Sequence, residues 1–425
     1  GAYEMVIDRL CREHGIGDVM PKIIASTATI SRAREQIKHL YAREESMLFP
    51  PSGLKSSDSF FAREAKGPGR MYLGVMAPAH FSLQTTEARV FATLLQSVAH
   101  MPANESSKDP WWTLLCFFNS LRELGSAATL MVADVREYMR VLMDRHGWAY
   151  KTMRNSIASE LTSRIRGDDI PKELAKLEIP LSAKVMDEPM AHPVDVCLAS
   201  NVIEVGVDLP RLSLMSVVGQ PKSTSQYIQV SSRVGRGKDK PGLVVVLYGQ
   251  SKPRDRSHYE HFRGYHQKLY AQVEPTSVTP FSAPAIERAI QGVLVSVIRQ
   301  LGELNHEAES PRPYPRTTNN NLVSVLETML TERSDIVTDG EATPAVIQLL
   351  RERLSEWRAW DPSEYGGFGK FPESPPLMYP AGANPPADWN GHSWPTLSSM
   401  RNVDASGEAD ITDWFNEVSS SEEHQ

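Results

Sequence analysis

Two arginines three residues apart, Arg233 and Arg236, are the side chains of this sequence best suited to bind phosphate. Gln229 precedes them on a segment that we predict to be a helix leaving a buried strand. Upstream, a loop containing Gly206 and Asp208 follows another apolar strand. Guanidinium forks and backbone N–H donors at the edge of a parallel sheet commonly hold the phosphates of a nucleotide. The spacing therefore indicates a nucleotide-phosphate site.

These segments resemble motifs of superfamily 2 helicases. The stretch ASNVIEVGVDLP, which begins at Ala199, is similar to motif V. The stretch QVSSRVGRG, which begins at Gln229, is similar to motif VI, with Ser232 in the position of the usual glycine. The tripeptide TAT from Thr27 to Thr29 resembles motif III, which in this family links the ATP site to the nucleic-acid site.

The resemblance implies a role for each matched residue of motifs V and VI. Arg236 would be the arginine finger toward the γ-phosphate, Arg233 its companion, and Gln229 a polar link between ATP and motif III. Gly206 would allow close backbone approach, and Asp208 would bond the ribose or a motif VI arginine. The implied cofactor-binding residues are Glu204, Gly206 and Asp208.

Six residues are expected to contact nucleic acid: Thr27, Thr29, Asn119, Arg164, Ser200 and Asn201. Ser200 and Asn201 stand where the helicase family touches the nucleic-acid backbone. Thr27 and Thr29 are equally compatible with ordinary threonines at a strand end. Asn119 and Arg164 are alternatively a helix cap and a surface residue.

Superfamily 2 motors bind ATP and Mg²⁺ between two RecA-like domains, and the first domain carries the Walker motifs. The sequence contains neither a GxxxxGK[ST] loop nor a DExH or DExD box before motif III. We therefore expect both motifs, and the Mg²⁺ ligands, to lie upstream of Gly1. This polypeptide would then be the C-terminal half of a helicase and inactive by itself, with the N-terminal half as its partner. No metal site is expected in it.

Apolar runs alternate with helical patterns along most of the chain, which predicts an α/β fold with a parallel sheet covered by helices on both faces. The resemblance implies that this sheet is RecA-like. The expected strands are 22–26, 71–76, 112–118, 160–164, 194–200, 213–219 and 242–248. A mainly helical C-terminal domain is predicted from helical spacing at 255–273, 282–304, 321–333 and 343–360.

These patterns divide the chain into four expected parts. Residues 1–105 would be the end of the first RecA-like domain with a connecting segment, and residues 106–250 the second RecA-like domain. Residues 251–360 would be the helical domain, followed by a Pro-, Gly- and Trp-rich loop and an acidic tail at 361–425.

The formal net charge of -7 is unevenly distributed. Seven acids and no Lys or Arg follow residue 401, while ten Lys and Arg residues lie between Lys222 and Lys268. Screening confines electrostatic attraction to about 10 Å, so this local basic stretch is what a phosphate experiences. The sequence shows no secretory signal, no apolar run long enough to span a bilayer and no CxxC motif, so we expect neither secretion nor a membrane span nor a structural zinc site.

Two aromatic segments leave alternatives open. The stretch from His258 to Tyr270 mixes cations and aromatic rings at helical spacing, which suits either stacking on a single strand or a solvated face. Trp389, His392 and Trp394 suit either a strand-separating or partner-docking element or burial against the helical domain.

Phrases outside the motifs, including LFPPSG, FFNSLRELG and WPTLSSMRNVD, resemble the DrmA family of helicases from the bacterial DISARM anti-phage system. The likeness runs from about Lys22 to Asp404. It implies an ATP-dependent DNA helicase of prokaryotic cytoplasm that acts on single-stranded DNA or on duplexes with a single-stranded end, with a second DISARM protein and no membrane. Two alternatives remain: an RNA-directed superfamily 2 motor, and a non-catalytic helicase-derived scaffold, which the missing Walker motifs favour and the intact arginine pair disfavours.

Overall fold

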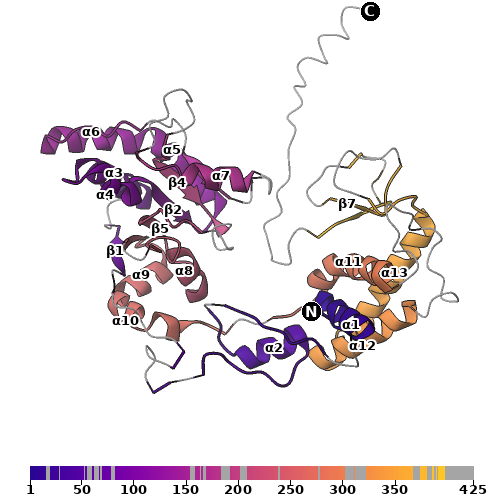
Figure 1. Cartoon of the computed structure of the whole chain (residues 1–425). Helices are drawn as coiled ribbons and strands as arrows, with labels where there is room; N and C mark the ends of the chain where they lie inside the picture. Colours follow the sequence, from indigo (N-terminus) through magenta and orange to yellow (C-terminus); the bar gives the residue numbers. More distant parts are fainter. Residues whose placement is uncertain are drawn as a thin grey trace, which may run out of the picture. The chain divides into compact units, whose positions relative to one another are not determined.

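The computed structural model (Figure 1) separates into two compact units, residues 65–273 and residues 1–64 together with 274–402. We call the first the sheet unit and the second the helical unit. The structure describes residues 1–15, 20–27, 29–51, 53–54, 60–61, 67, 69–77, 82–153, 158–162, 164–165, 169–182, 192–201, 208–237, 240–275, 278–301, 311, 322–366, 374–380, 385–386, 389 and 391–397.

The sheet unit is built on six strands in the order β1-β6-β5-β2-β4-β3, and every neighbouring pair is parallel. Because all strands run in one direction, their carboxyl ends meet at one edge of the sheet. The strands are β1 (Arg70–Met76), β2 (Leu114–Phe118), β3 (Ser159–Leu161), β4 (Val196–Ala199), β5 (Leu214–Val218) and β6 (Gly242–Tyr248).

Helices cover both faces of this sheet, which confirms the predicted layers. The sequence LLCFF of β2 is buried at all five positions and alternates between two cores. Leu115 and Phe117 join the core under α7 (Ile170–Leu177), α8 (Thr224–Ser231), α10 (Phe262–Gln267) and η2 (Leu269–Gln272). Leu114, Cys116 and Phe118 join the core under α3 (Leu83–His100), α5 (Leu121–Val132) and α6 (Asp134–His146). The remaining helices are α4 (Glu105–Trp112) and α9 (Pro253–Glu260).

The helical unit confirms the predicted helical C-terminal domain and adds the N-terminus to it. Its core is shared by α1 (Ala2–His14), α11 (Ala283–Leu301), α12 (Leu322–Thr338) and α13 (Thr343–Trp360). Figure 1 shows α1 beside α11 and α12. Ala2, Met5 and Val6 contribute the apolar face of α1 to that core. The unit also contains α2 (Ala33–Tyr41) and the short strand pair β7 (Met378–Tyr379) and β8 (Trp394–Pro395).

Burial decides between the alternatives for the tryptophan-rich segment. Trp389 and Trp394 are 2% and 4% exposed. The Trp394 ring packs between Trp357 and Trp360 of α13, and its Nε1 donates to Glu356 at 2.7 Å. The strand-separating hypothesis is therefore wrong for these two rings, because both are buried and Trp394 belongs to the core of the helical unit.

The expected strand at 22–26 is also wrong, because these residues adopt no regular structure. A parallel strand depends on hydrogen bonds to a neighbour, and none of the described strands pairs with this segment. Ile24 is 87% exposed. The apolar composition of residues 22–26 predicted a strand, but no described strand pairs with them.

The compact units divide the chain at other points than the expected boundaries after 105 and 250. Residues 70–76 pair with β6, and α3 packs on the same sheet, so both lie with the second predicted domain. Residues 253–272 pack on that sheet too, because Tyr265 and Leu269 are buried in its core. A search of the described helices for one long and apolar enough to cross a bilayer finds none.

Candidate nucleotide and nucleic-acid site

The arginine pair lies beyond α8 rather than on it, which corrects the predicted helix. Ser223 caps the start of α8 by accepting from Gln226 N at 3.2 Å, and the helix ends at Ser231. Half-buried Gln229 is on its last turn. After the helix ends, the chain turns so that Val234 is buried in the core of the sheet unit. A helix that continued through residue 234 would place this side chain elsewhere. We call residues 232–237 the arginine turn.

Gly235 is the point at which the arginine turn reverses. Its φ of 64° lies in the left-handed region, which side chains other than glycine rarely adopt. Its N–H donates to Leu212 O at 2.9 Å, the residue two before β5 begins. This bond fixes the turn to the sheet and determines where Arg236 leaves the backbone.

Arg236 is exposed and held at two of its nitrogens. Nη1 donates to Asp208 Oδ1 at 2.5 Å, and Nε donates to Ser232 O at 3.1 Å. Of the two contacts expected for Asp208, the structure contains the one to a motif VI arginine. Arg233 is only 7% exposed, so Arg236 is the arginine that a phosphate can reach from solvent.

Ser232 closes the end of α8 with its hydroxyl group. Its Oγ donates to Gln229 O at 3.0 Å, where glycine offers no such bond. Arg70 of β1 braces the same turn from the other side, donating from Nε to Val234 O at 2.7 Å. Sequence reasoning did not find Arg70, because 162 to 164 residues separate it from its partners.

Four predicted nucleic-acid residues follow three adjacent strands at the carboxyl edge. Asn119 comes after β2, Arg164 after β3, and Ser200 and Asn201 directly after β4. Arg164 and Asn201 are exposed. Ser200 is buried, and its N–H donates to Leu161 O at 3.2 Å. The sheet order therefore brings these residues to one edge.

Asn119 ties the ends of two neighbouring strands together. Its Nδ2 donates to Val218 O at 3.0 Å and to Gly219 O at 3.3 Å, at the end of β5. The side-chain amide is thus engaged in the structure of the edge itself. The alternative role of Asn119 as a helix cap is not needed, because Ser120 caps α5 by accepting from Glu123 N at 3.2 Å.

The other predicted site residues are placed differently. Thr27 and Thr29 belong to the helical unit, where Thr29 N donates to Thr27 Oγ1 at 3.3 Å. They are not in the sheet unit with the other site residues. Glu204 and Gly206 lie outside the described residues.

Asp255 is a site residue that sequence reasoning missed. It is 2% exposed and accepts from Gln220 N at 2.9 Å and Gly249 N at 2.8 Å, so it joins the loops after β5 and β6. Gln220 in turn accepts from Tyr248 OH at 3.3 Å. In the sequence, Asp255 stands among arginines and gives no sign of burial; only the helix-starting Pro253 indicates that a helix begins beside it.

His266 of α10, which bonds Tyr227 of α8, is a neutral histidine. His266 Nδ1 lies 2.7 Å from Phe262 O, a group that only accepts, so Nδ1 carries the proton. Nε2 then accepts from Tyr227 OH at 2.9 Å. Burial lowers the pKa of His266 below its ordinary value. The inner side of the basic, aromatic stretch therefore packs against the sheet unit, while Arg254, Arg263 and Tyr270 remain exposed.

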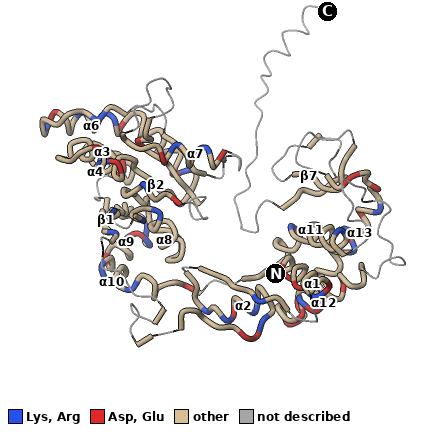
Figure 2. Tube along the Cα trace, viewed as in Figure 1, with Lys and Arg blue, Asp and Glu red and all other residues tan. Residues whose placement is uncertain are grey.

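Figure 2 shows Lys and Arg residues around α8, α9 and α10.

Comparison with known proteins finds similarity to helicases. A model of the helicase conserved C-terminal domain matches residues 175–238, from α7 through the arginine turn. The DISARM protein DrmA of Bacillus paralicheniformis is 44% identical over 306 residues, which are 70% of this chain and 26% of DrmA. The ATP-dependent DNA helicase RecG of Mycobacterium leprae is 36% identical over 95 residues, or 21% of this chain and 13% of RecG.

Among solved structures, the DUF1998 helicase MrfA bound to DNA and AMPPNP aligns with a TM-score of 0.44 at 14% identity, covering 70% of this chain and 34% of MrfA. The chain spans 26% of the length of its DrmA relative. The match to the helicase domain includes Asp208 and both arginines of the turn. Residues 175–238 of this chain therefore match the helicase conserved C-terminal domain, and the chain is similar over 70% of its length to the DISARM protein DrmA.

Proposed function

We propose that this chain forms the arginine-finger side of the ATP site in an ATP-dependent DNA helicase or translocase. The observation that carries the proposal is Arg236, exposed and held at Nε and Nη1 within the matched helicase domain. Its Nη2 has no hydrogen-bond partner among the described residues. A guanidinium fixed on one side and open on the other is a preorganised donor for a phosphoryl oxygen.

In this proposal Arg236 stabilises the negative charge that develops on the transferring phosphoryl group. Asp208 and the Ser232 carbonyl keep the guanidinium oriented. Gln229 and Arg233 are its proposed companions, and the proposed nucleotide contacts of Glu204 and Gly206 remain predictions. ATP and Mg²⁺ would be bound together with a first RecA-like domain that supplies the metal ligands. Relative motion of the two domains would then move the protein along DNA.

The proposed path of DNA follows the carboxyl edge of β2, β4 and β3. Exposed Arg164 and Asn201 are suited to the phosphate backbone, and the buried amide of Asn119 holds the edge beneath them. Ser200 contributes through its backbone position after β4. Thr27 and Thr29 are proposed contacts from the helical unit.

We propose the biological role of this chain from its similarity to DrmA. The 44% identity to DrmA supports a role in bacterial anti-phage defence, in the prokaryotic cytoplasm and together with a further DISARM protein. Because the chain spans a quarter of that relative, the substrate and the partner remain part of the proposal.

The experiment that tests the finger assignment is Arg236→Ala in the full-length protein. Turnover of ATP in the presence of DNA should fall by about 10³-fold, while DNA affinity changes by less than about 2-fold, because the finger acts on the transition state. Arg140→Ala is the matched control, since Arg140 is an exposed arginine of α6 in the same unit and pairs with Glu137. Equal loss of turnover and DNA binding in Arg236→Ala would contradict the proposal.

The same ATP-turnover assay tests whether DNA or RNA activates the full-length protein. Single-stranded DNA and single-stranded RNA of equal length are compared as activators, and the proposal expects stimulation by DNA. Stimulation by RNA alone would favour the RNA-directed alternative. Absence of turnover in the wild-type full-length protein with either polymer would favour the scaffold.

A further inference from the structure

An apolar groove in the helical unit has no place in the proposed ATP or DNA sites. It has a volume of about 680 Å³ and runs beside α13, with the buried Phe281, Ile286 and Val346 below it and Leu349 on its wall. All of its lining residues lie in the helical unit. We call it the α13 groove.

The α13 groove has the length of a short helix. Its lining includes the N-cap residue Ala342 and, at further spacings of three and four, Ala345, Leu349 and Glu352, which lie on one face of α13. At 1.5 Å per residue, that face extends over roughly 15 Å, or about three helical turns. Helices commonly bind partner helices by placing an apolar stripe in such a groove.

Carboxylates line the α13 groove, and its described lining residues include no Lys or Arg. Glu287, Glu341 and Glu352 line it, and none of them has an ion pair among the described residues. Three carboxylates within a few helical turns create a negative surface that repels phosphate within a Debye length of about 10 Å. Nucleic acid is therefore disfavoured as the occupant.

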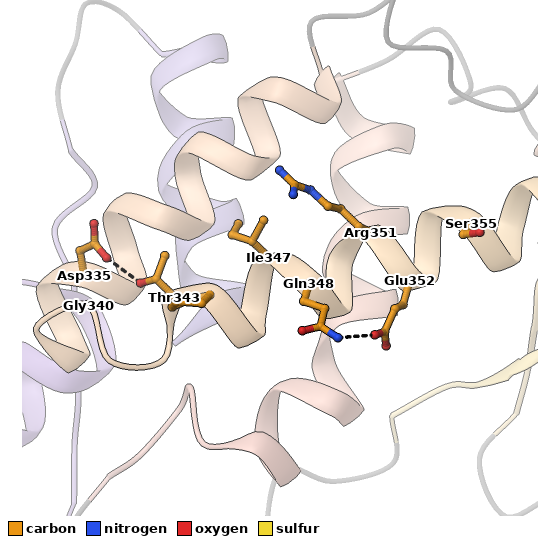
Figure 3. Close-up of a pocket in the computed structure, with 9 residues that line it drawn as sticks. Asp335, Gly340, Thr343, Ile347, Gln348, Arg351, Glu352 and Ser355 are labelled. Atoms are coloured by element: carbon orange, nitrogen blue, oxygen red, sulfur yellow. Dashed lines mark hydrogen bonds between the residues drawn. The ribbon is translucent and has the colours of Figure 1, made fainter.

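The adjoining depression on α13 also combines apolar residues with carboxylates (Figure 3). The residues that line it include the cation Arg351, whose Nε pairs with Glu327 at 3.1 Å. It measures about 900 Å³, and Figure 3 shows Ile347 between two polar pairs. Asp335 accepts from Thr343 Oγ1 at 2.6 Å, and Glu352 accepts from Gln348 Nε2 at 2.9 Å. Both donors are neutral side chains, so neither bond is an ion pair.

We propose that the α13 groove is a docking site for an amphipathic helix of a partner protein that carries apolar side chains flanked by Lys or Arg. The apolar floor takes the apolar stripe, and Glu287, Glu341 and Glu352 bind the flanking cations. The proposal assigns a protein partner to a surface that is separate from the proposed ATP and DNA contacts of the sheet unit.

The probe is a fluorescein-labelled Leu/Lys peptide of about 18 residues at helical spacing, which is long enough to fold as a helix. The same peptide with Glu in place of Lys is the charge control. Fluorescence anisotropy with the whole chain should give at least ~10-fold tighter binding of the Leu/Lys peptide, since three exposed charge contacts together amount to about that factor.

Charge reversal tests the rim. The triple variant Glu287→Lys, Glu341→Lys and Glu352→Lys should reverse the preference, binding the Leu/Glu peptide more tightly than the Leu/Lys peptide. Glu332→Lys is the matched control, because Glu332 is an exposed acid of α12 that does not line the groove. It should leave the preference for the Leu/Lys peptide unchanged.

Filling the groove tests its apolar part. Ala345→Trp adds bulk at an exposed position without changing charge, so the unit should still unfold cooperatively while peptide affinity falls by about 10-fold. The proposal is overturned if wild-type protein binds both peptides equally, or if the triple variant keeps its preference. It is also overturned if sedimentation shows a self-associating chain that the triple variant disperses.

Discussion

At the scale of single residues, the backbone of Gly235 matters more to the candidate site than any side chain next to it. A Cβ at this position would lie 2.6 Å from Gly242 N and 2.7 Å from Gly242 Cα, at the start of β6. Its φ of 64° adds backbone strain for any other residue. The glycine therefore lets the arginine turn approach β6 and hold Arg236 against Asp208.

Gly235→Ala should destabilise the sheet unit by about 1–3 kcal/mol, because the methyl group clashes with backbone that cannot move aside. ATP turnover of the full-length protein should fall with it, since Arg236 is displaced. Denaturant unfolding followed by circular dichroism measures the first effect. Gly125→Ala is the control: that glycine lies inside α5 with no atom within 4 Å of the added Cβ, so stability should rise slightly. An unchanged Gly235→Ala protein would contradict this account of the turn.

At the scale of elements, α3 and α5 bring two acidic side chains close to the start of α9. Glu87 of α3 is 5% exposed, and burial, followed by the nearby charge of Glu123, raises the pKa of its carboxyl to about 7, against a partial lowering by Lys252. Lys252 Nζ pairs with Glu123 Oε1 at 2.6 Å. One lysine thus neutralises one of two neighbouring carboxyls.

The raised pKa of Glu87 predicts a pH dependence with a definite sign. Between pH 4.5, the ordinary pKa of a glutamate carboxyl in the unfolded chain, and pH 7, the folded state holds a proton that the unfolded state has released. The contribution of Glu87 to stability is therefore greatest below pH 4.5, falls as pH rises toward 7, and is constant above. The loss is at most ~3 kcal/mol. Glu87→Gln should remove this slope and stabilise the sheet unit at pH 8.

The measurement is the free energy of unfolding of both proteins at pH 5 and pH 8. Glu137→Gln serves as the control, because Glu137 is an exposed acid of α6 that pairs with Arg140 at the surface. If Glu87→Gln has the same slope as wild type, the buried carboxyl is not the titrating group.

At the scale of the whole molecule, residues from opposite ends of the chain form one unit. Asp8 of α1 is 5% exposed and bonds Arg43 at 2.7 Å and Arg333 of α12 at 2.5 Å. The N-terminal helix is thus held to α12 by a buried charge cluster as well as by apolar packing. Removing the shared carboxylate leaves two guanidinium groups facing each other.

Asp8→Asn should lower the stability of the helical unit by about 3 kcal/mol, as is typical when a buried ion pair loses one partner. Hydrogen exchange read by mass spectrometry should show lost protection in α1, α12 and α13 but not in β2 or β5. Glu332→Gln, at an exposed position of α12, should change neither set. Equal loss of protection in the β-strands would contradict the division into two units.

Much of the architecture and part of the site were accessible from the sequence, because local patterns encode them. Fully apolar runs such as LLCFF predicted buried parallel strands, and helical spacing predicted α11 to α13. The residue types of Asp208, Arg233 and Arg236 indicated phosphate chemistry. Only the tertiary structure decided that KIIAS is not a strand, that α1 belongs with the C-terminal helices, that Asp255 joins the loops after β5 and β6, and that Arg70 braces the arginine turn. The physical reason is that residue type and periodicity are local, whereas strand pairing and buried hydrogen bonds depend on partners tens to hundreds of residues away.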